Sequence, residues 1–87
     1  MSNEEKKMAV MDAWLAAVAE EIGAPIDVIR THRDELLNLV STIAHGPSRP
    51  GAPMTMFLLG MCAAQESDVS ALTAKVSDLA QRYTPAE

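Results

Sequence analysis

Hydrophobic residues return every three or four positions in two stretches of the chain, one near its beginning and one near its end. The first stretch contains Met8, Met11, Leu15, Val18 and Ile22, and the second contains Val69, Leu72, Val76, Leu79 and Tyr83. Residues at this spacing share one face of an α-helix. The pattern therefore predicts helices over about 4–22 and 68–83, each of which buries one apolar stripe.

Local signals mark both ends of the first predicted helix. The side chain of Asn3 can accept a hydrogen bond from a free amide of the first turn. Glu4 and Glu5 suit the positive end of the helix dipole. Gly23 is a typical helix stop, and Pro25 follows it two residues later. We therefore expect a cap at Asn3 and the C-terminal end at Gly23.

The middle of the chain predicts a second helix over about 32–45. A connector containing Pro25 comes before it, with room for one short helical turn. Thr31 is followed three residues later by Asp34, which resembles a capping box with Asp in place of Glu or Gln. The apolar residues of this helix cover a wide arc: Leu36, Leu37, Leu39, Val40, Ile43 and Ala44. Such a wide arc indicates contact with more than one neighbouring helix.

A third helix is predicted over about 53–65, with Pro53 at a favourable first helical position. This segment is apolar on all sides, so we expect it at the centre of the fold. Gly60 lies close to Ala63 and Ala64 on one side of it. A glycine inside a helix costs about 1 kcal/mol relative to alanine unless another backbone approaches closely. We therefore expect another helix to cross near Gly60.

Together these elements predict an all-α fold, in which residues 1–87 form a single-domain bundle of four helices around an apolar third helix. A chain of 87 residues buries only about 60–65% of its unfolded surface. Cys62 is the single cysteine, so no internal disulfide can form, and no Cys and His cluster has zinc spacing. Stability must come from helix packing or self-association.

Charge and hydropathy exclude several classes of protein. The net charge is −5, and Lys and Arg form no stripe or tail, which argues against a nucleic-acid partner. The longest weakly polar run, 54–64, is shorter than the roughly 20 residues that cross a bilayer. Asp12 interrupts the apolar run from Met8, so we expect no secretory signal. The sequence predicts a cytoplasmic protein that contacts no membrane.

The connector between the second and third predicted helices contains the best candidate binding site. Residues 45–53 hold three of the five prolines and two of the four glycines. His45 and Arg49 lie near the N-terminus of the third helix, where free amides near Thr55 could help to hold a phosphate or carboxylate. The alternative is structural, because His45 and Arg49 can instead satisfy carbonyl groups of a tight loop that the prolines stiffen.

Catalytic groups are sparse. Cys62 with His32 or His45 would supply a thiol and a base, but Cys62 falls in the most apolar segment, where burial suppresses the thiolate. We interpret Cys62 as a small, reduced core residue. Glu20 and Glu21 are adjacent and so point in different directions. The sequence predicts no catalytic residues, no metal site and no cofactor, and therefore a protein that is not an enzyme.

Residues 44–60 resemble a small uncharacterised bacterial domain family with the pattern His-Gly-x-x-Arg-Pro-x-Ala-Pro-x-Thr-x-Phe-Leu-x-Gly. The matching positions are His45, Gly46, Arg49, Pro50, Ala52, Pro53, Thr55, Phe57, Leu58 and Gly60. Members of this family occur alone or joined to the C-terminal side of a nucleotidyltransferase of the molybdenum cofactor guanylyltransferase type. This chain lacks the glycine-rich nucleotide-binding segment of such a transferase.

The resemblance implies an accessory or protein-interaction module linked to maturation of molybdopterin guanine dinucleotide. Its partner would be a nucleotidyltransferase or another molybdenum cofactor protein, and the loop with the N-terminal half of the third helix would form the contact surface. Two alternatives stay open. One is a domain that binds a small anion or a nucleotide through the loop from His45 to Thr55. The other is a structural homodimer that uses the alanine face of the first helix, made of Ala9, Ala13, Ala16 and Ala17.

Overall fold

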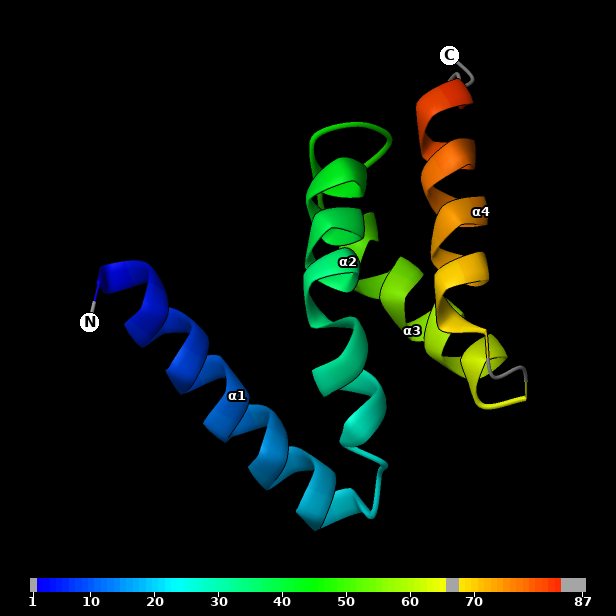
Figure 1. Cartoon of the computed structure of the whole chain (residues 1–87). Helices are drawn as coiled ribbons and strands as arrows, with labels where there is room; N and C mark the ends of the chain where they lie inside the picture. The colour runs from blue at the N-terminus through cyan, green and yellow to red at the C-terminus, as the bar shows by residue number, and fades with distance from the viewer. Residues whose placement is uncertain (1, 66–67, 84–87) are drawn as a thin grey trace. The chain divides into compact units, whose positions relative to one another are not determined.

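The computed structural model describes residues 2–65 and 68–83, and the rest of the predicted 1–87 domain lies outside these ranges. Four helices are present: α1 (Asn3–Ile22), α2 (Asp27–Ala44), α3 (Gly51–Ala63) and α4 (Val69–Arg82) (Figure 1). No strand occurs in the described ranges. The predicted all-α class and the number of helices are therefore confirmed. Residues 1–31 and 32–87 form two compact units, and each is described by itself.

The ends of α1 follow from two local signals. Ser2 caps the helix, because its Oγ accepts a hydrogen bond from the backbone N–H of Glu5 at 3.1 Å. The predicted cap, Asn3, is instead the first helical residue. Gly23 ends the helix as predicted, with φ at 71°. A side chain is strained at this left-handed φ, which explains the glycine.

The start of α2 differs from the prediction. The helix begins at Asp27, five residues before His32, and the backbone N–H of Arg30 already donates to the Ile26 carbonyl at 3.1 Å. Thr31 and Asp34 both lie inside the helix, so the predicted capping box is wrong. The negative charge of Asp27 suits the positive end of the helix dipole. Its Oδ1 also lies 3.8 Å from Nη1 of Arg30. The short turn expected in the connector is the first turn of α2 itself.

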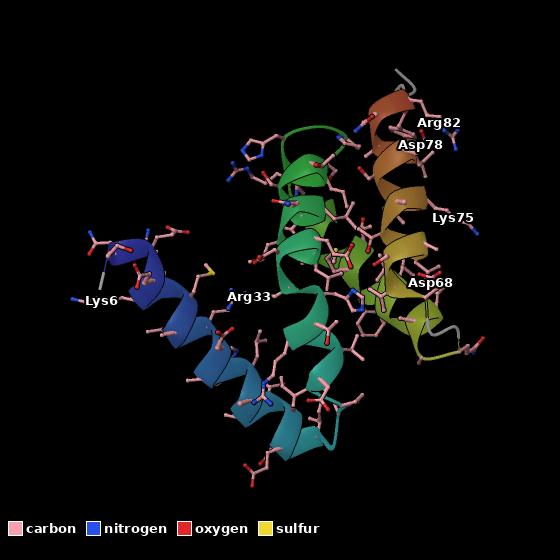
Figure 2. The ribbon with its side chains drawn as sticks, viewed as in Figure 1. Lys6, Arg33, Asp68, Lys75, Asp78 and Arg82 are labelled. Atoms are coloured by element: carbon pink, nitrogen blue, oxygen red, sulfur yellow. The ribbon has the colours of Figure 1, made fainter. Side chains whose placement is uncertain are left out.

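Side-chain oxygens accept hydrogen bonds from the first turns of α3 and α4, although only α4 has a side-chain bond from its N-cap residue. Ser48 Oγ accepts a hydrogen bond from the Gly51 N–H at 3.1 Å, so α3 begins two residues before the predicted Pro53. At the start of α4, Asp68 accepts from the Ala71 N–H at 2.9 Å (Figure 2). The predicted start of the last helix near Asp68 is confirmed. The outer side of α4 carries Lys75, which points away from α2 (Figure 2).

The core of the unit formed by residues 32–87 lies where α3 crosses α2 and α4 (Figure 1). Its buried residues are Leu39 and Ile43 from α2, and Ala52 and Leu59 from α3. Partly buried residues of α4 complete it: Leu72, Val76 and Ala80. The apolar arc of α2 and the stripe of α4 therefore supply much of this core, whereas three of their members stay exposed: Leu37, Leu79 and Tyr83.

Within the unit of residues 32–87, the neighbouring helices cover only part of α3. The rest of the unit leaves four of its large apolar side chains more than half exposed: Met54, Phe57, Leu58 and Met61. A Cβ added at Gly60 would meet no atom of the described residues within 4 Å, so no other described helix of this unit crosses there. Cys62 is exposed and is not the predicted core residue. Two neighbouring helices of this length cover only one side of a third helix.

Candidate functional site

His45 follows the last residue of α2 and completes the hydrogen bonding of that helix. Its backbone N–H donates to the Ser41 carbonyl at 3.0 Å. Its side-chain Nδ1 lies 2.8 Å from the same carbonyl oxygen, to which a protonated Nδ1 donates. The Ser41 carbonyl, which already accepts from the His45 backbone N–H, gains a second donor in this way. His45 thus bonds to a backbone carbonyl, as expected if it has a structural role in the connector.

The loop after His45 is tied back to α2 by its own backbone. The N–H groups of Gly46 and Ser48 both donate to the Ile43 carbonyl, at 3.2 Å and 3.1 Å. The chain passes so close to α2 that a Cβ at Gly46 would lie 2.9 Å from the Thr42 carbonyl oxygen. A backbone atom cannot move aside as a flexible side chain can. The loop therefore requires glycine at position 46.

The N-terminus of α3 offers little to an anion, because its first amides already have partners. The Gly51 N–H donates to Ser48 Oγ, and the Ala52 N–H donates to the Arg49 carbonyl at 3.2 Å. Pro53 has no N–H. The hydroxyl of Thr55 donates to the Gly51 carbonyl at 2.8 Å. The groups that would form a helix N-terminal anion site are thus used within the chain.

Arg49 is exposed at the turn before α3. Within residues 2–65 and 68–83, no hydrogen bond or ion pair engages its guanidinium. His45 is also exposed, as expected. Of the three residues predicted to bind an anion, His45 and Thr55 use side-chain atoms in hydrogen bonds within the chain, and Arg49 does not.

The connector meets α4 at an apolar hollow of about 190 Å³. Its lining comes from the end of α2, the loop, α3 and α4: Ile43, Pro47, Thr55, Val76, Leu79, Ala80 and Tyr83. The structure brings Thr55 here but leaves His45 and Arg49 outside the lining. The contribution of α4 could not be seen in the sequence, because it depends on how the helices pack.

The exposed side of α3 forms a continuous stripe, which we call the apolar face. It consists of Met54, Phe57, Leu58 and Met61, whose exposed fractions are 70%, 68%, 63% and 57%. These positions are spaced by three, one and three residues, so they lie on the same side of the helix. Phe57 and Leu58 belong to the motif in the sequence. The apolar face and the connector are therefore neighbours along the chain.

A polar groove of about 260 Å³ separates α2 from α4. It is lined by Glu35, Asn38, Leu39, Thr42, Ser70, Thr73, Ala74 and Ser77. Sequence reasoning missed this groove, although a signal for it exists. On each helix three polar residues recur at spacings of three and four, Glu35, Asn38 and Thr42 on α2 and Ser70, Thr73 and Ser77 on α4.

Glu35 is the charged group of the polar groove. Its Oε1 accepts hydrogen bonds from the ring of His32 and from Ser70 Oγ, the latter at 2.8 Å. These two hydrogen bonds lower the pKa of the Glu35 carboxyl below its ordinary value. The side chain is therefore ionised at neutral pH. The bond to Ser70 also joins α2 to α4 across the groove.

We expect these contacts to make the stability of the chain depend on pH. A carboxyl with a lowered folded-state pKa stabilises the fold above its unfolded pKa, and this contribution is lost as the pH falls through the folded value. The melting temperature of wild-type protein should exceed that of Glu35→Gln at pH 7, and the difference should shrink below about pH 4. Thermal melts at pH 7, 5 and 3 check this, with Glu20→Gln as the matched control. A difference that is constant with pH would contradict it.

Other chemistry is sparse in the part of the chain that the structure describes. No group of three or more His, Cys, Asp or Glu side chains there could hold a metal ion. None of the helices described is both long and apolar enough to cross a membrane. The strongest features are therefore the apolar face, the apolar hollow and the polar groove.

Comparison with known proteins identifies a family. Residues 6–87 match the model of a domain of unknown function, DUF6457. No curated protein matches the chain, and no solved structure matches it. Because the match extends over most of the sequence, including the connector and all of α2, α3 and α4, the chain belongs to the DUF6457 family.

Proposed function

We propose that this chain is a non-catalytic protein-interaction module and that the apolar face of α3 is its contact surface. The observation that carries the proposal is the exposure of Met54, Phe57, Leu58 and Met61, each between 57% and 70%. Monomeric soluble proteins rarely leave large contiguous apolar patches uncovered. Aromatic residues and methionine are also enriched at protein interfaces.

The spacing of these residues suggests how a partner is bound. An amphipathic helix commonly docks into a groove through anchors at positions i, i+3, i+4 and i+7. Met54, Phe57, Leu58 and Met61 occupy these four positions in α3. A partner would thus present an apolar groove with a basic rim, which complements the net charge of −5.

The resemblance of residues 44–60 supports a particular class of partner. This resemblance implies relatives that are fused to nucleotidyltransferases of the molybdenum cofactor guanylyltransferase type. We therefore propose that this chain binds such a transferase in the cytoplasm and acts as an accessory in the maturation of molybdopterin guanine dinucleotide.

Titration calorimetry with the purified nucleotidyltransferase from the same cell tests the proposal. Phe57→Ser should raise the Kd by about 30-fold, since a central interface residue contributes about 2 kcal/mol or more. The melting temperature should hardly change, because the Phe57 side chain is 68% exposed. Tyr83→Ser is the matched control, since this aromatic residue is 52% exposed but lies on α4's side of the hollow.

Two results would contradict this function. The first is the absence of any heat of binding between the wild-type chain and the transferase. The second is a Kd for Phe57→Ser that equals the wild-type value, which would place the contact elsewhere on the chain. Loss of binding in Tyr83→Ser but not in Phe57→Ser would point to the apolar hollow as the contact surface.

A further inference from the structure

One side of α1 carries an exposed stripe that the proposed function does not use. This α1 stripe consists of residues spaced by three and four positions: Lys7, Val10, Trp14, Ala17 and Glu21. Residues at this spacing lie on one face of a helix, and the contact face of a two-stranded coiled coil has the same spacing. All of them are exposed, including Val10 at 70% and Trp14 at 66%. The stripe is therefore open to a second helix.

The helix α1 gains little burial within its own chain. Ala19 is the only buried residue of this helix, although most of the stability of a helix in a protein comes from packing. Beside Trp14 the helix surface forms a hollow of about 390 Å³, lined by Trp14, Ala17, Val18, Glu21 and Ile22. Tryptophans that fill pockets are typical anchors of protein interfaces. The α1 stripe therefore has the features of a contact surface.

The charges at the two ends of α1 have the wrong sign for their own helix. Glu20 and Glu21 lie in the last turn, at the negative end of the helix dipole, and that turn contains no basic residue. Lys6, which is labelled in Figure 2, and Lys7 lie near the positive end, where cations are disfavoured. Both pairs of residues would therefore be stabilised by opposite charges from another molecule.

A second copy of α1 that runs antiparallel supplies these charges. Lys7 and Glu21 are each seven residues from Trp14, so when two copies cross at Trp14, Lys7 of one copy lies opposite Glu21 of the other. A two-fold axis repeats the contact, so both charge pairs form. A parallel pair would place lysine beside lysine and glutamate beside glutamate, which is unfavourable. Charge complementarity therefore selects an antiparallel second copy.

We propose that the α1 stripe is a homodimer interface, in which two copies of α1 pack antiparallel about Trp14 and pair Lys7 with Glu21 at each end. Val10 then packs against Ala17 of the second copy, which places a large side chain beside a small one. The α1 stripe shares one residue, Ala17, with the alanine face of the helix. It shares none with the apolar face of α3, so this dimer does not depend on the proposed function.

Sedimentation equilibrium of the full chain tests the proposal. From micromolar to millimolar concentration the mass should rise from one chain to two. Over the same range the fluorescence of Trp14, the single tryptophan, should shift to shorter wavelength as its ring leaves water. Trp14→Ser should raise the dimer Kd about 30-fold or more, because a central tryptophan is typically a dominant interface residue. Phe57→Ser changes an exposed aromatic residue on α3 and should leave the dimer Kd unchanged.

Charge reversals test the antiparallel arrangement without altering Trp14. Lys7→Glu or Glu21→Lys alone should raise the dimer Kd about fivefold or more, because each change places like charges together at both ends of the dimer. The double variant Lys7→Glu/Glu21→Lys should restore the wild-type Kd, since opposite charges again lie together. Lys75→Glu, on the outer side of α4, is the matched control and should have no effect.

Three results would overturn the proposal. The first is a wild-type chain that remains a monomer at millimolar concentration. The second is a dimer that Phe57→Ser dissociates and Trp14→Ser does not, which would place the interface on α3. The third is a double charge variant that dimerises as weakly as either single variant, which would mean that Lys7 and Glu21 do not pair between copies.

Discussion

Replacing Leu39 by alanine is expected to lower the free energy of unfolding by about 2–5 kcal/mol. Leu39 is 2% exposed and is the largest fully buried side chain among the described residues. It lies in the core cluster with Ile43, Ala52 and Leu59, so its truncation opens a cavity between α2 and α3. Small domains have only a few kcal/mol of stability in reserve. The variant should therefore be largely unfolded at physiological temperature.

The matched control is the same substitution on the exposed side of α3. Leu58 is 63% exposed, and Leu58→Ala should change the free energy of unfolding by no more than about 0.5 kcal/mol. Urea denaturation followed by circular dichroism measures both variants. Equal losses in the two variants would mean that the apolar face of α3 is covered in solution, for instance by a second copy of the chain.

Gly46→Ala and Gly60→Ala should change stability in opposite directions. A Cβ at position 46 would lie 2.9 Å from the Thr42 carbonyl oxygen, whereas one at position 60 would meet nothing within 4 Å. The first substitution forces the loop away from α2 and should cost about 1–3 kcal/mol. The second removes an unnecessary helical glycine and should add about 0.5–1 kcal/mol.

Thermal and urea unfolding of the two glycine variants test whether only Gly46, or both glycines, are needed for close packing. If both glycines served close packing, as the sequence suggests for Gly60, both variants would be destabilised. A stabilised Gly60→Ala protein that still binds its partner would also show that position 60 lies outside the contact surface. Destabilisation of Gly60→Ala would indicate a close neighbour at that position.

The motif around the connector serves two purposes in this structure. Gly46 and Thr55 have structural roles, since one permits close approach to α2 and the other bonds to the Gly51 carbonyl. Phe57 and Leu58 are exposed and contribute nothing to the core. One sequence motif can thus contain both residues that stabilise a loop and residues that are exposed to another molecule.

Some elements were predictable because their determinants are local. Gly23 ends α1 through its own backbone conformation, and Asp68 starts α4 through a hydrogen bond three residues along the chain. The start of α2 was not predicted, because the pair Thr31 and Asp34 imitates a cap. Residues 27–30, which include two β-branched side chains, extend the helix instead. A local cap signal is not sufficient when the residues before it can also form helix.

The candidate sites were less predictable than the helices. His45, Arg49 and Thr55 are close in the sequence, yet the hydrogen bonds of the folded loop engage His45 and Thr55 within the chain. The polar groove joins Glu35 to Ser70, and only the packing of α2 against α4 brings these distant positions together. The sequence shows that three polar residues recur on each helix at spacings of three and four. It does not show that these two helices pack against each other.

The sequence by itself determined the all-α class, the number of helices and the apolar stripes, because hydrophobic spacing and capping act over one or two helical turns. The tertiary structure alone decided which side of α3 is buried and which polar faces meet. A segment that is apolar on every side carries no periodic signal. Its exposed stripe, Met54, Phe57, Leu58 and Met61, is fixed only by where the neighbouring helices stop covering it.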